Sequence, residues 1–312
     1  MKAVPLASPP HRPVLYQEII EYLAPKSPGL YLDCTAGAGG HSSGILQASS
    51  PDGKLLALDV DPIAISLTQT RLAPFGERAV VVQASYIEAA RILQQIDWDA
   101  LDGILMDLGV SSMQLDQQER GFSFRHDAPL DMRFDPTKGQ SAAELLNNLS
   151  EKDLADIIWR FGEERFSRRI ARKIVEHRPL ETTFQLADLV RSAVGGKKSK
   201  IDPATRTFQA IRIAVNDELQ AIEKAIPNLI ALLKPKGRLA VISFHSLEDR
   251  LVKQAFKRES IDCLCPPEQL ICTCGHKASV NLLTTKPVTA TAEENEENPR
   301  ARSAKLRVLE KK

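Results

Sequence analysis

Short apolar runs alternate with amphipathic stretches in the first third of the chain, and this alternation constrains the fold more than any other feature. The apolar runs have the length of strands and occupy residues 30–34, 55–60, 79–83 and 101–108, with helical patterns at 63–72 and 86–95 between them. Such an alternation predicts an α/β fold, in which a parallel sheet has helices on both faces. Because ligands of these sheets bind at the carboxyl ends of the strands, we expect the functional residues there.

The pattern changes after residue 108. A polar, turn-rich segment at 109–139 has the length of a lid, and the helical patterns that follow have no strand between them. These patterns cover residues 141–149, 151–161, 163–176, 184–194 and 204–233, the last with an expected break near Pro227. We interpret this part as an all-helical domain inserted into the α/β domain.

Strand patterns return near the end of the chain. Residues 238–244 form a strand candidate before a helical pattern at 247–258, and two more strand candidates lie at 279–285 and 304–309. The acidic stretch 293–297 between the last two is expected to be a solvated loop. The predicted organisation is the first part of the α/β domain at 1–112, the helical insertion at 113–212, and the second part of the α/β domain at 213–312.

Composition excludes several classes of protein. A chain with 43% hydrophobic and 26% charged residues is typical of packed soluble proteins and not of disordered ones. No apolar run reaches the roughly 18 residues of a membrane span, and the Pro-rich start lacks a signal-peptide core, so we expect a cytoplasmic protein without a membrane partner. The net charge is only +1, but residues 160–212 hold 13 lysines and arginines against six acidic residues. A basic surface of this kind attracts phosphate groups.

A glycine-rich segment, DCTAGAGGHS, follows the first predicted strand at residues 33–42 and leads into a helix. Gly37, Gly39 and Gly40 allow a sharp turn and let a ligand approach bare amides at a helix N-terminus, where an anionic group is favoured. A tight turn with no ligand is the alternative interpretation. The dinucleotide fingerprint would need a third glycine at Ser42, which disfavours an NAD site.

Three more residues follow predicted strands at the same edge. Asp59 ends the second strand, where a carboxylate can accept hydrogen bonds from the hydroxyls of a ribose, and Asp61 next to it is the expected N-cap of a helix. Tyr86 follows the third strand and offers a ring to an adenine, although a role in the core is equally compatible. Asp107 ends the fourth strand near the reacting end of a ligand, and an ion-pair role is its alternative.

These strand ends resemble those of S-adenosylmethionine-dependent methyltransferases, and eight segments make the resemblance more specific. They read HRPVL at 11–15, DCTAGAGGHS at 33–42, DLGVSS at 107–112, RGFSF at 120–124, LDMR at 130–133, PATRTFQAIRI at 203–213, ISFHSLEDR at 242–250 and NPRARS at 298–303. In this order they resemble the bacterial family of small-subunit ribosomal RNA cytosine-N4 methyltransferases, also called RsmH or MraW. The resemblance covers essentially the whole chain.

The resemblance implies a Rossmann-like methyltransferase domain with a helical insertion, S-adenosyl-L-methionine as the cofactor, and methylation of a cytosine amine in the decoding region of 16S ribosomal RNA, within the small subunit. It leaves the oligomeric state open, a homodimer included. The cofactor contacts it implies are Gly39, Gly40, His41, Asp59, Tyr86, Asp107 and Gln114. Tyr86 stands where some members have Phe.

The residue that handles the amine is less clear. Many amino-group methyltransferases are expected to carry an Asn/Asp-Pro-Pro-aromatic motif after the fourth strand, whereas this chain has Asp107-Leu-Gly-Val-Ser-Ser. Asp107 is our catalytic candidate. His245 and Ser246, at the end of a later strand, are secondary candidates, and a structural role for His245 is an equal alternative.

Four of the five cysteines form two close pairs, Cys263-x-Cys265 and Cys272-x-Cys274. Four thiolates can hold a tetrahedral zinc ion, but the usual spacing is C-x2–4-C, so free or redox-labile thiols are the alternative and the sequence assigns no metal. Two other functions compete with RNA methylation. A nicotinamide oxidoreductase would share Asp59, and a non-catalytic ribosome-assembly protein would share only the basic helical surface.

Overall fold

The computed structural model describes residues 13–195, 202–269 and 271–312. The chain divides into two compact units, which we call the sheet unit (Met1–Leu108 with Ile222–Lys312) and the helical unit (Gly109–Ala221). The side chains of Val110 and Val215 pack against the core of the helical unit. This unit therefore extends beyond both ends of the predicted range 113–212.

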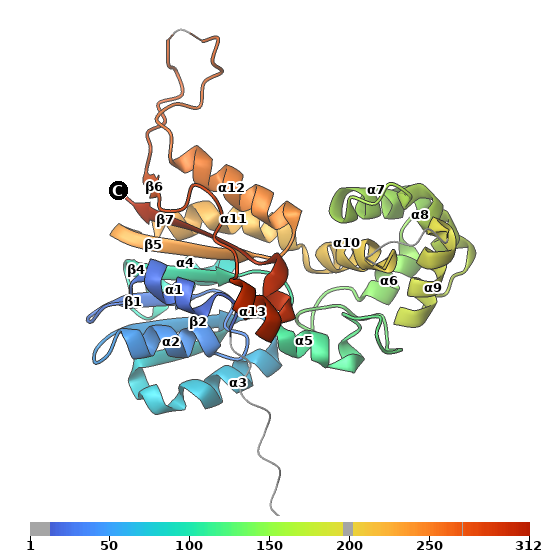
Figure 1. The fold of residues 1–312 in the computed structure, drawn as a ribbon, viewed down its shortest axis with the longest axis horizontal. Coiled ribbons are helices and arrows are strands. Elements are labelled where there is room, and N and C mark those ends of the chain that lie inside the picture. The colour runs from blue at the N-terminus through green and yellow to red at the C-terminus, as the bar shows by residue number, and fades with distance from the viewer. Residues whose placement is uncertain (1–12, 196–201, 270) are drawn as a thin grey trace, which may run out of the picture. The chain divides into compact units, whose positions relative to one another are not determined.

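The sheet unit is built on a sheet of seven strands in the order β3-β2-β1-β4-β5-β7-β6 (Figure 1). The strands are β1 (Leu30–Asp33), β2 (Lys54–Asp59), β3 (Ala79–Gln83), β4 (Leu101–Asp107), β5 (Leu233–Ser243), β6 (Val280–Leu282) and β7 (Lys305–Lys311). Pairing is parallel from β3 through β5, while β7 runs antiparallel to both β5 and β6. The order reverses at β1 and β4, and ligands of open α/β sheets bind at such a switch point.

Helices cover the sheet because its central strands are apolar on both faces. The helices of this unit are α1 (Tyr16–Leu23), α2 (Gly40–Ala48), α3 (Pro62–Leu72), α4 (Ala89–Gln95), most of α11 (Glu218–Ala231), α12 (Ser246–Glu259) and α13 (Ala292–Glu297). Side chains of α1, α2 and α3, among them Ile19, Ile45 and Leu72, share a buried cluster with strand residues such as Leu105. Burial on both faces is usual for parallel strands, and it confirms the predicted fold class.

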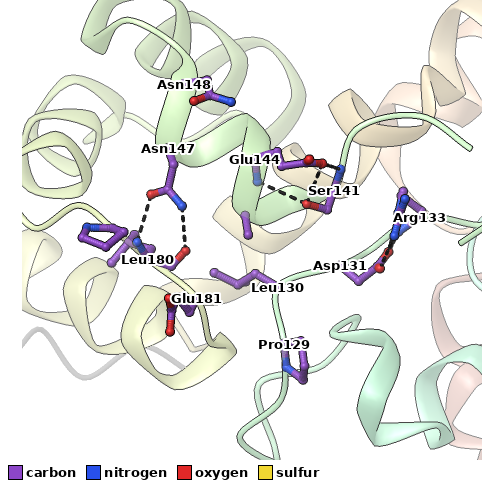
Figure 2. A pocket seen from close by; sticks show the side chains of 12 residues that line it. Pro129, Leu130, Asp131, Arg133, Ser141, Glu144, Asn147, Asn148, Leu180 and Glu181 are labelled. Atoms are coloured by element: carbon purple, nitrogen blue, oxygen red, sulfur yellow. Dashed lines mark hydrogen bonds and ion pairs between the residues drawn. The ribbon is translucent and has the colours of Figure 1, made fainter.

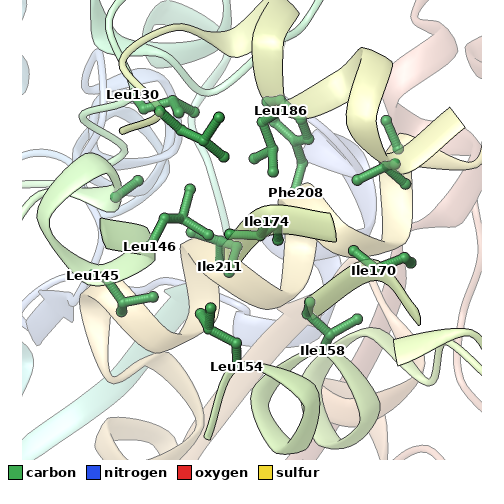
Figure 3. Packing of buried hydrophobic residues seen from close by; sticks show 14 of the residues in the cluster. Leu130, Leu145, Leu146, Leu154, Ile158, Ile170, Ile174, Leu186, Phe208 and Ile211 are labelled. Carbon is green, nitrogen blue, oxygen red and sulfur yellow. The ribbon is translucent and has the colours of Figure 1, made fainter. Parts of the chain in front are cut away.

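The helical unit contains α5 (Ser112–Asp116), α6 (Ala142–Asn148), α7 (Glu151–Gly162), α8 (Ser167–Glu176), α9 (Thr183–Val194) and α10 (Ala204–Asn216). Its core is formed by one apolar stripe from each of the longer helices, and Figure 3 shows Leu146, Ile158, Ile174, Leu186 and Phe208 meeting there. Side chains of Ser141, Ser150 and Thr182 cap α6, α7 and α9 by accepting from backbone N–H groups three residues on. Capping residues ahead of apolar stripes explain why these helices begin where they do.

Two local predictions were wrong. The helical pattern 204–233 breaks at Asp217, whose φ of 50° ends α10, and Pro227 lies inside α11. Burial of Ile226 and Leu229 on either side of this proline keeps the helix intact despite the lost hydrogen bond. The acidic stretch 293–297 belongs to α13, where the hydroxyl of Thr291 accepts from the N–H of Glu294 (3.2 Å).

Within the described ranges, none of the helices is both long and apolar enough to cross a membrane.

Candidate active site

Asp33, the last residue of β1, organises the glycine-rich segment. Its buried carboxylate accepts a hydrogen bond from the hydroxyl of Ser42 (2.6 Å) in α2 and another from the N–H of Thr35 (3.1 Å). Burial raises the pKa of Asp33 to about 6, against the lowering effect of these two bonds. The sequence analysis placed Asp33 in the motif but not among the site residues. An acidic residue that directly follows an apolar strand is the signal that could have identified it.

The turn after β1 requires glycine at two positions. Gly39 has a φ of 72°, and a Cβ there would lie 3.3 Å from the Cα of Thr68. A Cβ on Gly40 would clash with the ring of Pro13. The hydroxyl of Thr68 also donates to the carbonyl of Gly37 (2.9 Å), which fixes the turn against α3. The first amides of α2, which have no partner within the helix, therefore lie at a rigid turn that favours an anionic group.

Asp59, at the end of β2, also bonds to the glycine-rich turn. Its Oδ2 accepts from the N–H of Gly37 (2.8 Å) and its Oδ1 from the N–H of Asp61 (2.9 Å). Each oxygen keeps a second lone pair that can accept from a ligand hydroxyl. Burial raises the pKa of Asp59 to about 6, because desolvation outweighs the lowering effect of the backbone hydrogen bonds. Asp61 caps α3 by accepting from the N–H of Ile63 (2.9 Å), which confirms its predicted role.

Asp107 ends β4 on the opposite side of β1. In the sheet register Asp33 is level with Ala57 and Leu105, so Asp59 and Asp107 both lie two residues further toward the C-terminal edge. The N–H of Asp107 donates to the hydroxyl of Thr35 (2.7 Å), which connects β4 to the glycine-rich turn.

The Asp107 carboxylate is poorly satisfied. Its buried Oδ1 has no hydrogen-bond partner among the described residues. Burial raises the pKa of Asp107 well above its usual value, and the nearby carboxylates of Asp33 and Glu248 raise it further. A cation bound at this point would favour the ionised form of the carboxyl group.

His41, in the first turn of α2, lies beside Asp107 but does not neutralise it. The two side chains approach to 3.7 Å between Nε2 and Oδ2. Burial lowers the pKa of His41 to about 4. The imidazole is therefore neutral at neutral pH, and its ring lies nearly parallel to that of Tyr16, at 6.2 Å between centroids.

The sheet unit places most of the predicted cofactor residues at one edge. Gly39, Gly40 and His41 follow β1, while Asp59 and Asp107 end the neighbouring strands. Tyr86 begins a short 3-10 helix, Tyr86–Glu88, beyond β3, after Ser85 caps it. Gln114 belongs to the helical unit, where it forms a reciprocal pair of hydrogen bonds with Ser111 (3.0 and 3.2 Å). Its contact with the cofactor stays a prediction.

His245 lies at the C-terminal end of β5, as predicted, but its ring is used locally. Its Nδ1 accepts from the N–H of Glu248 (3.4 Å), and its Nε2 lies 3.1 Å from Oε1 of the same residue. The other carboxylate oxygen of Glu248 accepts from the N–H of Phe244 (2.8 Å). This arrangement caps α12 and favours the structural role for His245.

Two cavities are lined by described residues of the helical unit. Figure 2 shows the first cavity, of about 540 Å³. Polar side chains that line it already have partners: Asp131 pairs with Arg133 (2.7 Å), and both amide atoms of Asn147 bond to the backbone of Leu180 (2.9 Å each). Paired groups leave little for a ligand, so we assign it no function.

The second cavity, of about 410 Å³, lies between α7 and α8 and is different in character. Trp159, whose side chain is 57% exposed, lines it together with Arg165, Arg168 and Arg169. Within the described part of the chain these three arginines form no ion pair, and Arg165 stacks on the ring of Phe166 (4.7 Å to the centroid).

The mainly parallel sheet, with a glycine-rich turn after β1 and acidic residues ending β1, β2 and β4, defines an α/β protein with a candidate ligand site at its switch point. The model of the MraW methylase family matches residues 8–312, and the chain belongs to this family.

Two relatives are similar to this chain over nearly its whole length. Ribosomal RNA small subunit methyltransferase H of Geotalea uraniireducens is 52% identical over 306 residues, which cover 96% of this chain and 98% of the relative. The protein of the same name from Dehalococcoides mccartyi is 50% identical over 302 residues, 97% of this chain and 86% of its own. An rRNA methylase from Streptococcus thermophilus is a distant structural likeness, with a TM-score of 0.43 and 11% identity over 97% of this chain and 99% of its own.

Proposed function

We propose that the protein transfers the methyl group of S-adenosyl-L-methionine to the N4 amine of a cytidine in the decoding region of 16S ribosomal RNA. Membership of the MraW methylase family and the names of its relatives support ribosomal RNA methylation. The observation that carries the proposal is the set of three carboxylates around the glycine-rich turn, the buried Asp33 and the half-buried Asp59 and Asp107.

The charge of this edge fits a cationic nucleoside. Within the described ranges, no lysine or arginine forms an ion pair with any of the three carboxylates, and burial raises the pKa of each. A sulfonium and an ammonium group would favour the ionised carboxylates, while the carboxylate of the same cofactor suits the first amides of α2. The free lone pairs of Asp59 suit ribose hydroxyls, and Tyr86 is the candidate for packing against adenine.

The residues at this edge also fit the chemistry of the amine. The cofactor supplies a methyl group on a positively charged sulfur, which is a good leaving group. A cytosine amine is a weak nucleophile, because its lone pair is delocalised into the ring. In this proposal the carboxylate of Asp107, whose Oδ1 has no partner among the described residues, accepts a hydrogen bond from the amine, which increases electron density on nitrogen, and then takes the proton as the new N–C bond forms.

His41 is neutral at neutral pH and lies 3.7 Å from Asp107 without a hydrogen bond to it. In this scheme His41 is a cofactor contact and Asp107 the catalytic residue.

The surface around the second cavity of the helical unit suits single-stranded RNA. Arg168 and Arg169 offer charge to phosphates, and the exposed ring of Trp159 offers a face on which a base can stack. Unpaired bases of this kind are the form in which proteins mostly read RNA sequence. Lys197, Lys198 and Lys200, which the sequence analysis assigned to the same basic surface, lie outside the described residues.

Incubation of the protein with labelled S-adenosylmethionine and small subunits that lack the mark tests this function. We expect one modified nucleotide in 16S RNA, identified by mass spectrometry as N4-methylcytidine in the decoding region. Naked 16S RNA in a parallel reaction distinguishes free RNA from the assembled subunit as substrate. Label at a ring carbon or a ribose, or no label in either substrate, would contradict the proposal.

A further inference from the structure

The loop between α12 and β6, residues 260–279, projects from the sheet unit as a long excursion (Figure 1). Among its described residues the large apolar side chains are not buried, since Ile261, Leu264 and Ile271 are 37%, 38% and 77% exposed. A segment of this length without buried apolar side chains needs another source of order. The two Cys-x-Cys pairs lie in this loop.

The four cysteines of the loop converge on one point. The sulfur atoms of Cys263, Cys265, Cys272 and Cys274 all lie within 4.8 Å of one another, and none of the four forms a disulfide. The separations of Cys263 from Cys272, of Cys272 from Cys274 and of Cys263 from Cys274 are 3.4, 3.6 and 3.9 Å. Four sulfurs placed about 2.3 Å from one zinc ion in a tetrahedron are separated by about 3.8 Å.

The convergence of the four sulfur atoms makes the short Cys-x-Cys spacing compatible with a zinc site. A single Cys-x-Cys pair is tighter than the usual zinc spacing, but here two such pairs face each other across the loop. Each pair contributes two corners of the same tetrahedron.

Backbone groups support negative charge on the sulfurs. The N–H of Leu264 donates to the sulfur of Cys274 (3.3 Å), and the N–H of Cys265 donates to that of Cys263 (3.4 Å). Donors of this kind stabilise thiolates, which are the form that binds a metal, and they orient the ligands.

We propose that Cys263, Cys265, Cys272 and Cys274 bind one structural zinc ion that orders the loop 260–279. Four thiolates with no open position match a closed structural site and not a catalytic one, and soft sulfur ligands select zinc over magnesium or calcium. Thiols that are protonated before binding release their protons to the solvent as the four Zn–S bonds form. The site is separate from the edge formed by β1, β2 and β4, so it can fail while methylation stands.

Metal analysis of the untagged, full-length protein tests this site. After purification under reducing conditions without chelator, we expect about one zinc per chain, and Co²⁺ substitution should give the visible d–d bands of a tetrahedral thiolate site. Both Cys265→Ser and Cys272→Ser should lower the zinc content several-fold. The matched control is Cys34→Ala, which removes the remaining cysteine from β1's turn and should leave the zinc content unchanged.

Protease sensitivity supplies a readout that does not depend on any variant. Removal of the metal from the parent protein by a chelator should expose the loop to trypsin at Lys277, and added Zn²⁺ should restore protection. A parent protein without zinc whose four thiols react freely, or one that forms disulfides among them under the same conditions, would overturn the proposal. Equal zinc content in the parent and in Cys272→Ser would do so as well.

Discussion

The sheet unit and the helical unit differ in the sign and in the exposure of their charged side chains. The sheet unit holds the buried Asp33 and the half-buried Asp59 and Asp107 without lysine or arginine partners among the described residues, whereas the helical unit exposes Arg165, Arg168 and Arg169 around Trp159. A buried carboxylate costs free energy until a ligand neutralises it, so it suits a small cation held in one geometry. Exposed arginines cost little and are screened by salt, so they suit a long polyanion. The two surfaces thus fit two parts of one reaction, a cofactor and an RNA.

The largest expected effect is on chemistry at Asp107. We expect Asp107→Asn, which keeps the size but removes the charge, to lower the methyl-transfer rate on the order of 100-fold, the scale of losing one preorganised electrostatic partner. Single-turnover rates at saturating S-adenosylmethionine measure this effect separately from binding. Recovery of the parental rate at saturation would make Asp107 a cofactor-binding residue only and would return attention to His245 and Ser246.

The second prediction concerns cofactor affinity. Asp59→Ala removes two hydrogen bonds to a charged group, worth about 1.5 to 3 kcal/mol each, so we expect affinity for S-adenosylmethionine to fall tens-fold or more. Asp61→Asn is the matched control, because asparagine also caps helices and Asp61 faces α3. Calorimetry measures both variants. An unchanged dissociation constant for Asp59→Ala would remove the ribose assignment.

The third prediction is a pH dependence. The pKa of Asp59 in the free protein is raised to about 6, and a cationic cofactor favours the ionised form, so binding lowers this pKa and releases protons. Affinity should therefore fall as the pH drops below about 6, by up to tenfold per unit for each carboxyl that titrates. The free protein should show the reverse trend: because the folded pKa exceeds the unfolded one, these carboxyls stabilise it as the pH falls from about 6 to about 4. Calorimetry and thermal unfolding across this range measure both, and an affinity independent of pH would contradict the assignment.

The fourth prediction tests the helical unit. Trp159→Ala should weaken binding of single-stranded RNA about tenfold, within the range of about 1 to 3 kcal/mol for a stacked base, and Trp159→Phe should retain most of the affinity. Phe184→Ala is the control, since Phe184 is an exposed aromatic residue on α9, outside the cavity. Equal losses in both alanine variants would indicate a general effect on the unit and not stacking.

The smallest effect concerns the basic segment that the structure does not describe. Neutralising Lys197, Lys198 and Lys200 together should flatten the dependence of RNA affinity on salt by roughly 0.7 in the logarithmic slope per lost phosphate contact. Filter binding at several salt concentrations gives the slope. An unchanged slope would mean that these lysines contact solvent only.

The sequence predicted the sheet well because buried parallel strands are nearly continuous apolar runs, as in β2 and β4. It also predicted the position of Asp59 and Asp107, because a residue that ends such a strand lies at the C-terminal edge of the sheet. It could not predict the hydrogen bonds that Asp33 accepts from Ser42 and Thr35, because both bonds depend on the conformation of the glycine-rich segment.

Tertiary contacts explain the remaining errors. Burial around Pro227 overrides the tendency of proline to break a helix, and the link from the N–H of Leu15 to Glu294 (2.7 Å) ties the short acidic helix α13 to the N-terminal region. Neither contact can be read from local sequence. The convergence of four cysteines across a loop is of the same kind, because spacing alone argued against it.

The proposed role of the sheet unit is cofactor binding and that of the helical unit is RNA binding, and one set of calorimetric titrations tests this division most directly. Dissociation constants for S-adenosylmethionine and for a single-stranded decoding-region RNA are measured on the parent, on Asp59→Ala and on the triple variant Trp159→Ala/Arg168→Ala/Arg169→Ala. The account predicts that Asp59→Ala loses affinity for the cofactor alone and that the triple variant loses affinity for the RNA alone. A triple variant that binds RNA like the parent, or an Asp59→Ala protein that binds the cofactor like the parent, would contradict it.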